Sequence, residues 1–252
     1  MLELFKILFV IPFLLYSCYS DLRTRRVSNR VWLVMLAIGI QFTLYDLSVY
    51  RLPYLYVLAF SAGFIFVFVY LLFEFGAFGG ADAKVLIVLS IIIPAYPVLD
   101  IWGYSLPVAG KPLIDIFAFS IFGNAVLLTI VVPMFLLIYN LTHLTISKVG
   151  NPAYLHVGYM CDISELKGKH VKLMHQYERA EGGVLLTFRR SGVVVTDEVH
   201  AELLKLRDEG LIGRKVWVTP GLPFMIPITL GFFVAIVYGD LIYLITRAFL
   251  TG

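Results

Sequence analysis

Residues 54–73 read YLYVLAFSAGFIFVFVYLLF, twenty residues without a charged side chain. About 20 helical residues are needed to cross ~30 Å of hydrocarbon, so this run has the length and composition of a membrane span. Of the 252 residues, 60% are apolar and 15% are charged, whereas a soluble domain has roughly a quarter of its residues charged. We therefore expect an integral membrane protein and exclude a disordered chain, a fibrous protein and a disulfide scaffold.

Five further apolar runs are long enough to be spans, which predicts six transmembrane helices. The six runs are Leu2–Ser20, Val31–Leu47, Tyr54–Phe73, Ala83–Val98, Ile114–Leu141 and Leu222–Phe249. The first is followed, not preceded, by arginines, so we interpret it as a retained span and not as a cleaved signal peptide.

The sequence between the fifth and sixth runs, Thr142–Pro220, is rich in charged residues. Gly183–Thr187 and Gly192–Thr196 are predicted to be short strands joined near Arg190 and Ser191. Thr196 is predicted to cap a helix that ends at Gly210, and Val216–Val218 to form a last strand. The expected fold is thus an α-helical integral membrane protein with a small α+β insertion. The expected divisions are 1–141 (membrane domain with spans one to five), 142–220 (soluble cytoplasmic domain) and 221–252 (sixth span).

Lysine and arginine predict the orientation of these spans. Four arginines follow the first span, Lys84 follows the third, and eleven more basic residues lie in the insertion. Six alternating spans place these sixteen on one side, against Lys6, Arg51, Lys111 and Arg247 on the other. We therefore expect a multi-pass protein of the cell membrane, with the insertion in the cytoplasm and both termini outside.

Two aspartates at the expected cytoplasmic interface are candidates for chemistry, because carboxylates at membrane depth cost roughly 2.5–3.5 kcal/mol. Asp21 closes the first span and Asp82 opens the fourth. Two nearby carboxyls can share one proton: the ionised one takes a proton from water and the protonated one polarises a scissile carbonyl. The pair predicts an aspartyl endopeptidase, although an N-cap or a surface ion pair would also account for each residue alone.

The residues around both aspartates resemble a known family. Gly79, Gly80, Ala81 and Asp82 are similar to the glycine–any–glycine–aspartate motif of intramembrane aspartyl proteases, and Lys84 extends the match. The stretch from Asp21 to Arg30 is similar to a prepilin peptidase motif, an aspartate with basic residues and then isoleucine-proline-asparagine. Pro223-Phe224, with Pro227 and Gly231, resembles the opening of that family's last span. The chain thus resembles the archaeal preflagellin peptidases of the type IV prepilin peptidase family, with Ala81 and Ser28 in place of a glycine and a proline.

The resemblance implies a substrate class: preflagellin or pilin-like precursors whose short basic leader is cut at the cytoplasmic face. Asp21 and Asp82 are the implied catalytic residues, with support from Gly79, Gly80, Ala81 and Lys84. Glu74, beside the loop to Asp82, is a possible contact for the basic leader. With two cysteines, the chain cannot build the paired-cysteine zinc segment of many bacterial members. We expect a peptidase without N-methyltransferase activity, with no metal, no cofactor and no nucleic-acid partner, and with the lipid bilayer around it.

Two other classes of function remain open at this point. A proton-coupled transporter also uses intramembrane carboxylates, but it favours sites near the midplane and repeated halves. A membrane scaffold of a filament assembly machine would use the insertion for docking.

Two finer expectations concern the pair of aspartates. Asp82 is expected to ionise first, because it lies at a helix N-terminus and Asp21 lies at a helix end, unless Arg23 or Arg25 folds back onto Asp21. Gly76, Gly79 and Gly80 predict a permissive loop. Without substrate, Asp21 and Asp82 are therefore expected to lie too far apart to share a proton, and substrate is expected to close the site.

Overall fold

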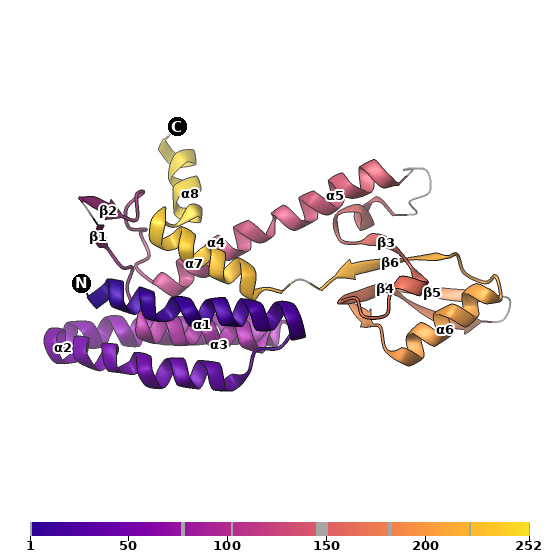
Figure 1. The fold of residues 1–252 in the computed structure, drawn as a ribbon. Helices are drawn as coiled ribbons and strands as arrows, with labels where there is room; N and C mark the ends of the chain where they lie inside the picture. The colour runs from indigo at the N-terminus through magenta and orange to yellow at the C-terminus, as the bar shows by residue number, and fades with distance from the viewer. Residues whose placement is uncertain are drawn as a thin grey trace. The chain divides into compact units, whose positions relative to one another are not determined.

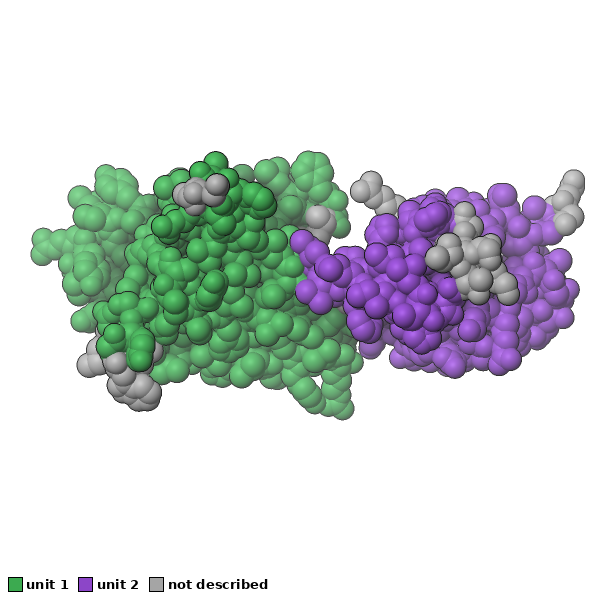
Figure 2. Space-filling model, turned by 90° about the horizontal axis from the view of Figure 1, so that it is seen from above, with its two compact units in different colours: residues 1–129, 223–252 green, residues 130–222 purple. Residues whose placement is uncertain are grey.

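The computed structural model describes residues 2–76, 79–101, 103–144, 151–180, 183–221 and 223–251. The chain forms two compact units, residues 1–129 with 223–252 and residues 130–222, which are coloured separately in Figure 2. We call the first the helical unit and the second the sheet unit, and each is described by itself.

The helical unit consists of helices and one short hairpin (Figure 1). Its elements are α1 (Leu2–Thr24), α2 (Asn29–Glu74), α3 (Gly80–Ile92), β1 (Leu99–Ile101), β2 (Tyr104–Leu106), α4 (Phe117–Thr129), α7 (Met225–Val237) and α8 (Leu241–Thr251).

Helix α2 is two helical segments and not one straight rod. The backbone of Arg51 leaves the helical region (φ 54°, ψ −133°), and Figure 1 shows that the chain reverses direction there. Pro53 follows within the next turn, where its missing N–H favours a break. The second and third predicted spans lie on these two segments.

Three helical stretches are long and apolar enough to cross a membrane: Leu2–Thr24, Asn29–Glu74 and Phe117–His143. A fourth candidate is the pair α7 and α8, which are bent by 59° at their junction. The fourth predicted span lies on α3, which has 13 residues, fewer than a full crossing requires. The structure thus shows a mostly helical protein with candidate membrane helices, and the number of six spans stays a prediction.

The core of the helical unit is apolar and is formed by α1, α2, α3, α4 and α7. Fully buried side chains from these helices include Val10, Leu14, Leu86, Phe117 and Phe232. Among apolar helices in a bilayer, association depends on close packing and polar contacts, because lipid is as apolar as leucine. The closest approach is at Gly231 of α7, where an added Cβ would lie 2.6 Å from the carbonyl oxygen of Ile121.

Two buried acids inside the helical unit, Asp46 and Asp240, have polar partners. Lys6, which is 1% exposed, contacts Glu3 at 2.8 Å and forms an ion pair with the buried Asp46. Asp240 accepts a hydrogen bond from the Ser120 hydroxyl at 2.6 Å. Such pairing is required because an uncompensated charge in these surroundings costs several kcal/mol.

The sheet unit is a four-stranded antiparallel sheet with the order β3-β6-β4-β5. Its elements are α5 (Val131–His143), the 3-10 turn η2 (Pro152–His156), β3 (Tyr159–Asp162), the 3-10 turn η3 (Ile163–Glu165), β4 (Val171–Ala180), β5 (Gly183–Val194), α6 (Asp197–Asp208) and β6 (Lys215–Pro220). The buried Asn140 amide ties α5 to the turn after it by donating to the carbonyls of Leu155 and Gly158, both at 2.7 Å.

The predicted cap and last strand of this unit are confirmed, and the predicted strand pair is wrong. Thr196 caps α6 by accepting from the Val199 N–H. Gly183–Thr187 and Gly192–Thr196 were expected to be two strands joined near Arg190 and Ser191, but one strand, β5, runs through that point. The irregularity there is a register shift against β4, at Gly192, whose φ of +68° suits glycine.

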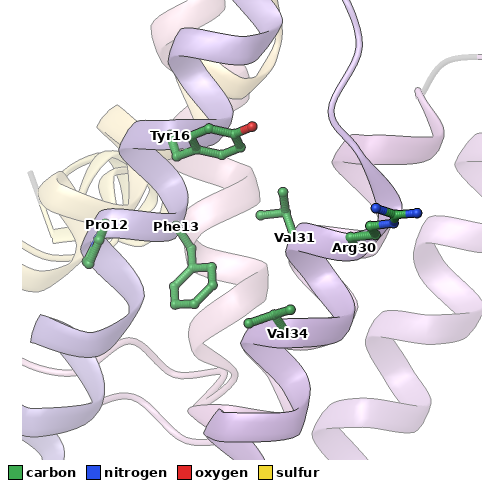
Figure 3. A pocket seen from close by; sticks show the side chains of 6 residues that line it. All are labelled: Pro12, Phe13, Tyr16, Arg30, Val31 and Val34. Carbon is green, nitrogen blue, oxygen red and sulfur yellow. The ribbon is translucent and has the colours of Figure 1, made fainter.

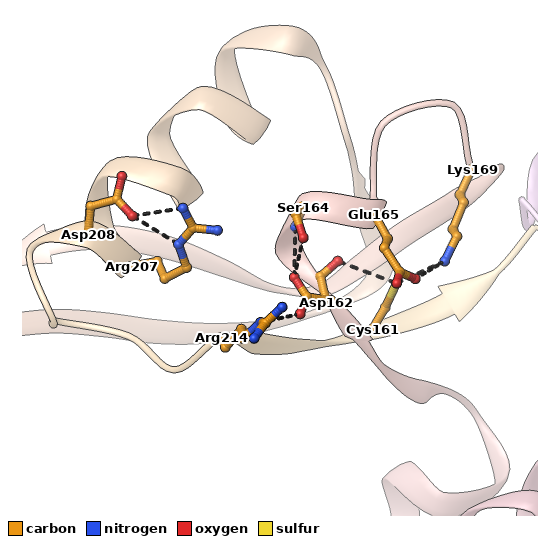
Figure 4. A network of polar contacts seen from close by, with 8 residues as sticks. All are labelled: Cys161, Asp162, Ser164, Glu165, Lys169, Arg207, Asp208 and Arg214. Atoms are coloured by element: carbon orange, nitrogen blue, oxygen red, sulfur yellow. Dashed lines mark hydrogen bonds and ion pairs between the residues drawn. The ribbon is translucent and has the colours of Figure 1, made fainter.

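Asp162 organises the turn after β3 (Figure 4). Its carboxylate accepts from the Ser164 N–H at 3.0 Å and from Arg214 Nε at 2.6 Å. The Ser164 hydrogen bonds, followed by Arg214, lower the pKa of Asp162 to about 2. The carboxylate is therefore ionised at neutral pH, and the stability it adds is lost as the pH falls from about 4 toward 2.

We expect Gly231→Ala to destabilise the helical unit by about 1–3 kcal/mol, because the new methyl group would force α7 away from the α4 backbone. Gly63→Ala is the matched control, since no atom lies within 4 Å of a Cβ added there, and alanine favours helices. Thermal unfolding of both purified variants in detergent is the measurement. Equal melting temperatures for the two variants would contradict the close packing at Gly231.

Candidate active site

Asp21 lies in the last turn of α1 and is half-buried. Its Oδ2 accepts a hydrogen bond from the backbone N–H of Met225 at 3.3 Å. Met225 is the first residue of α7, so the partial positive charge of that helix N-terminus faces the carboxylate and favours it by roughly 0.3–1 kcal/mol. The chain thus places Asp21 between the end of one helix and the beginning of another.

Cys18 holds α1 against α7 next to this contact. Its thiol lies one turn before Asp21 and donates to the Thr229 hydroxyl at 3.0 Å and to the Met225 carbonyl at 3.2 Å. Sequence reasoning missed Met225 and Thr229 as neighbours of Asp21. Pro223-Phe224 indicated only the start of a span and not which residue it would face.

Asp82 lies in the first turn of α3 and is 9% exposed. Its carboxylate lies directly against the backbone of Gly79, since a Cβ added to Gly79 would be 2.7 Å from Asp82 Oδ2. Gly80 has open space around the same position. The position of the Asp82 carboxylate therefore favours glycine at position 79 but not at position 80.

The two aspartates come from different helices and lie at the same end of the helical unit. Asp21 lies in the last turn of α1, and Asp82 lies in the first turn of α3. Three other acids of the helical unit have partners elsewhere: Asp46 pairs with Lys6, Asp240 with Ser120, and Asp115 accepts from the Tyr96 N–H at 2.7 Å.

Lys84 and Glu74 take different positions around this pair. The Lys84 ammonium donates to Asn29 Oδ1 at 2.7 Å, so it contacts the start of α2 and not Asp82. Glu74 is the last residue of α2 and is exposed. Ala81 is half-buried in the first turn of α3. The loop expected to permit closure includes Ala77 and Phe78, which lie outside the described residues.

The geometry removes the reason for expecting Asp82 to ionise before Asp21. That expectation assumed that only Asp82 lies at a helix N-terminus, whereas Asp21 accepts from the N-terminus of α7 as well. The helix dipoles therefore do not distinguish the two carboxyls. The closure of the site by substrate stays a prediction.

An apolar groove lies on the surface of the helical unit (Figure 3). It runs between α1 and α2 and is lined by Pro12, Phe13, Tyr16, Arg30, Val31 and Val34. Tyr16 and Asp21 are five residues apart on α1, which turns their side chains roughly 140° from each other. The groove therefore does not lead to the two carboxyls.

The fold and this site define a mainly helical protein with membrane-type helices and two neighbouring aspartates. The sequence profile of the type IV leader peptidase family matches residues 8–138, and that of the archaeal peptidase A24 C-terminus, type II, matches residues 150–241. The chain therefore belongs to the type IV leader peptidase family and is a peptidase. The resemblance inferred from the motifs is confirmed.

Its relatives are similar over most of their length. The preflagellin peptidase of Methanococcus voltae is 29% identical over 239 residues, which cover 90% of this chain and 92% of that protein. Preflagellin peptidases of Methanococcus maripaludis and Methanocaldococcus jannaschii are 25% and 26% identical, each over 232 residues and 90% of this chain. The match covers 92% and 91% of those two proteins.

We expect Gly79→Ala to lower cleavage about 100-fold, because the methyl group would displace the Asp82 carboxylate by about an ångström or more. Gly79 has φ −79° and ψ 151°, which alanine adopts freely, so folding should be unchanged. Gly80→Ala is the matched control, with open space at the same motif and cleavage expected within about 2-fold of wild type. Cleavage assays and thermal unfolding of both variants are the measurements, and wild-type cleavage by Gly79→Ala would show that the carboxylate does not need this space.

Proposed function

We propose that this peptidase is a membrane-embedded aspartyl endopeptidase that removes a short basic leader from preflagellin or pilin-like precursors. The observation that carries the proposal is the placement of Asp21 in the last turn of α1 and of Asp82 in the first turn of α3, both inside the region that matches the type IV leader peptidase profile. The names of the relatives and the two matching family profiles support the substrate class.

The proposed reaction needs the two carboxyls and one water molecule. The ionised carboxyl removes a proton from water, which attacks the scissile carbonyl, while the protonated carboxyl donates a hydrogen bond to the carbonyl oxygen. The proton is then returned to the leaving amine. Two carboxyls close together favour this state, because both do not ionise readily at short range. The reaction requires no metal, and among the described residues no three His, Cys, Asp or Glu side chains gather as a metal site.

The proposed topology places the reaction at the cytoplasmic face of the cell membrane. In it, α1, the two segments of α2, α3, α4 with α5, and α7 with α8 form six crossings, with both termini outside. The arginines at 23, 25, 26 and 30 then lie on the same side as Asp21, which agrees with the positive-inside rule. A leader that carries basic residues would approach from that side, ahead of its apolar helix.

The proposal includes proteolysis and excludes methyl transfer to the new N-terminus. The chain has two cysteines, Cys18 in the helical unit and Cys161 in the sheet unit, and neither has a cysteine partner. A paired-cysteine zinc segment of the kind associated with the bifunctional bacterial relatives therefore cannot form here.

We expect Asp21→Asn and Asp82→Asn each to lower cleavage of a purified precursor at least about 1,000-fold, because an amide replaces neither the base nor the acid. Asp100→Asn is the control, since Asp100 lies in the β1–β2 hairpin and contacts Ser105. Both site variants should insert into membranes and unfold like wild type. Turnover near the wild-type rate by either one would exclude the aspartyl mechanism.

We expect Glu74→Gln to raise KM about 2- to 5-fold for a precursor with a basic leader and to leave kcat unchanged. The reason is that an exposed charge pair contributes modestly to binding and is screened by salt. Glu178→Gln, in β4 of the sheet unit, is the control. An unchanged KM at low ionic strength would mean that Glu74 does not contact the leader.

A further inference from the structure

Lys84 and Asn29 are 55 residues apart and joined by a hydrogen bond between their side chains at 2.7 Å. Asn29 is the first residue of α2 and follows the turn after Asp21, while Lys84 lies two residues after Asp82 in α3. The bond thus connects the segment that carries one aspartate with the helix that carries the other.

The turn between Asp21 and Asn29 is held by its own hydrogen bonds. The hydroxyls of Ser20 and Thr24 both donate to the carbonyl of Arg26, at 2.7 and 3.0 Å. Arg25 has a φ of +55°, which is an uncommon conformation for a residue with a side chain. Asn29 is therefore fixed relative to the last turn of α1, where Asp21 lies.

The other link to Asp82 runs from the end of α2 to the start of α3 and includes Ala77 and Phe78, which lie outside the described residues. Gly76 has a φ of +66° and Gly79 is the N-cap of α3, which begins at Gly80. Glycine permits many backbone conformations. Among the described residues, the Asn29–Lys84 pair is the hydrogen bond that joins the turn of residues 20–30 to the start of α3.

Lys84 does not act on Asp82 by direct contact. Residues two apart on a helix point to different sides, and the ammonium of Lys84 is directed to Asn29. Any effect on the carboxyl is therefore transmitted through the position of the first turn of α3.

We propose that the hydrogen bond between Asn29 and Lys84 sets the separation of the Asp21 and Asp82 carboxyls, which makes both residues positioning residues of the peptidase. The inference rests on the proposed function. It assigns a role to two motif residues that do not touch the reacting atoms.

The test is an exchange of donor and acceptor, measured by kcat and KM on a purified precursor in detergent. Lys84→Met and Asn29→Leu each remove the bond, and each is expected to lower kcat about 10- to 100-fold with KM within about 3-fold. The double variant Asn29→Lys with Lys84→Asn restores the bond in the opposite direction and should recover kcat to within about 5-fold of wild type. Lys111→Met, which removes a lysine paired with Asp115, is the control.

Three outcomes would overturn the proposal: wild-type kcat in both single variants, a loss confined to KM, or a double variant no better than the singles. Should Lys84→Met fail to accumulate, Lys84→Arg keeps a donor at the same place and is expected to retain kcat within about 5-fold. Asp21→Asn and Asp82→Asn are assayed in parallel. If these two stay active, the proposed function fails; if they are inactive and Lys84→Met cleaves normally, the positioning role alone fails.

Discussion

A carboxylate among apolar helices is stable only where a partner compensates its charge, and this requirement governs the arrangement of the helical unit. Asp46 has Lys6, Asp240 has the Ser120 hydroxyl, and Asp115 has a backbone N–H. Asp21 and Asp82 are compensated differently. Asp21, in the last turn of α1, accepts from the N-terminus of α7, and Asp82 lies in the first turn of α3.

This arrangement of the two acids determines which other residues cannot vary freely. Gly79 must lack a side chain because the Asp82 carboxylate occupies that space. Cys18 and Thr229 keep α1 against α7, so that the Met225 N–H meets Asp21. The turn after Asp21 is fixed by hydrogen bonds, whereas the loop before Asp82 is rich in glycine.

Much of this fold could be predicted from apolar runs, because a membrane span is long and has a simple composition. The reversal inside α2 could also be predicted, because Arg51 and Pro53 lie between two apolar runs. The short hairpin of β1 and β2 and the strands β3 and β4 were not predicted. The ten residues of β4 include His175, Gln176, Glu178 and Arg179, so alternation of apolar and polar residues is weak there. β5 continues through Arg190 and Ser191 as one strand that pairs with β4. The residues at that point carry no local signal of this pairing.

The two aspartates could be selected from the sequence because their motifs are local. Their contacts could not, because these join residues far apart in the chain. Lys84 could be named only as a motif residue near Asp82, and the hydrogen bond of its side chain to Asn29, 55 residues earlier, has no local signal. Likewise, nothing near Asp21 in the sequence indicated that the N-terminus of α7, about 200 residues later, would face it.

The two departures from the family motifs are explained by backbone geometry. Ser28, which stands where a proline is usual, has φ −64° and ψ 136°, and −65° is the φ to which the proline ring is restricted. The serine adopts the same backbone and adds a cap, since its side chain accepts from the Arg30 N–H at 3.4 Å. Ala81 replaces a glycine within the first turn of a helix, where alanine is the better helix former. What the motif needs at this end is a rigid entry into α2 and a bare backbone at Gly79, and both are retained.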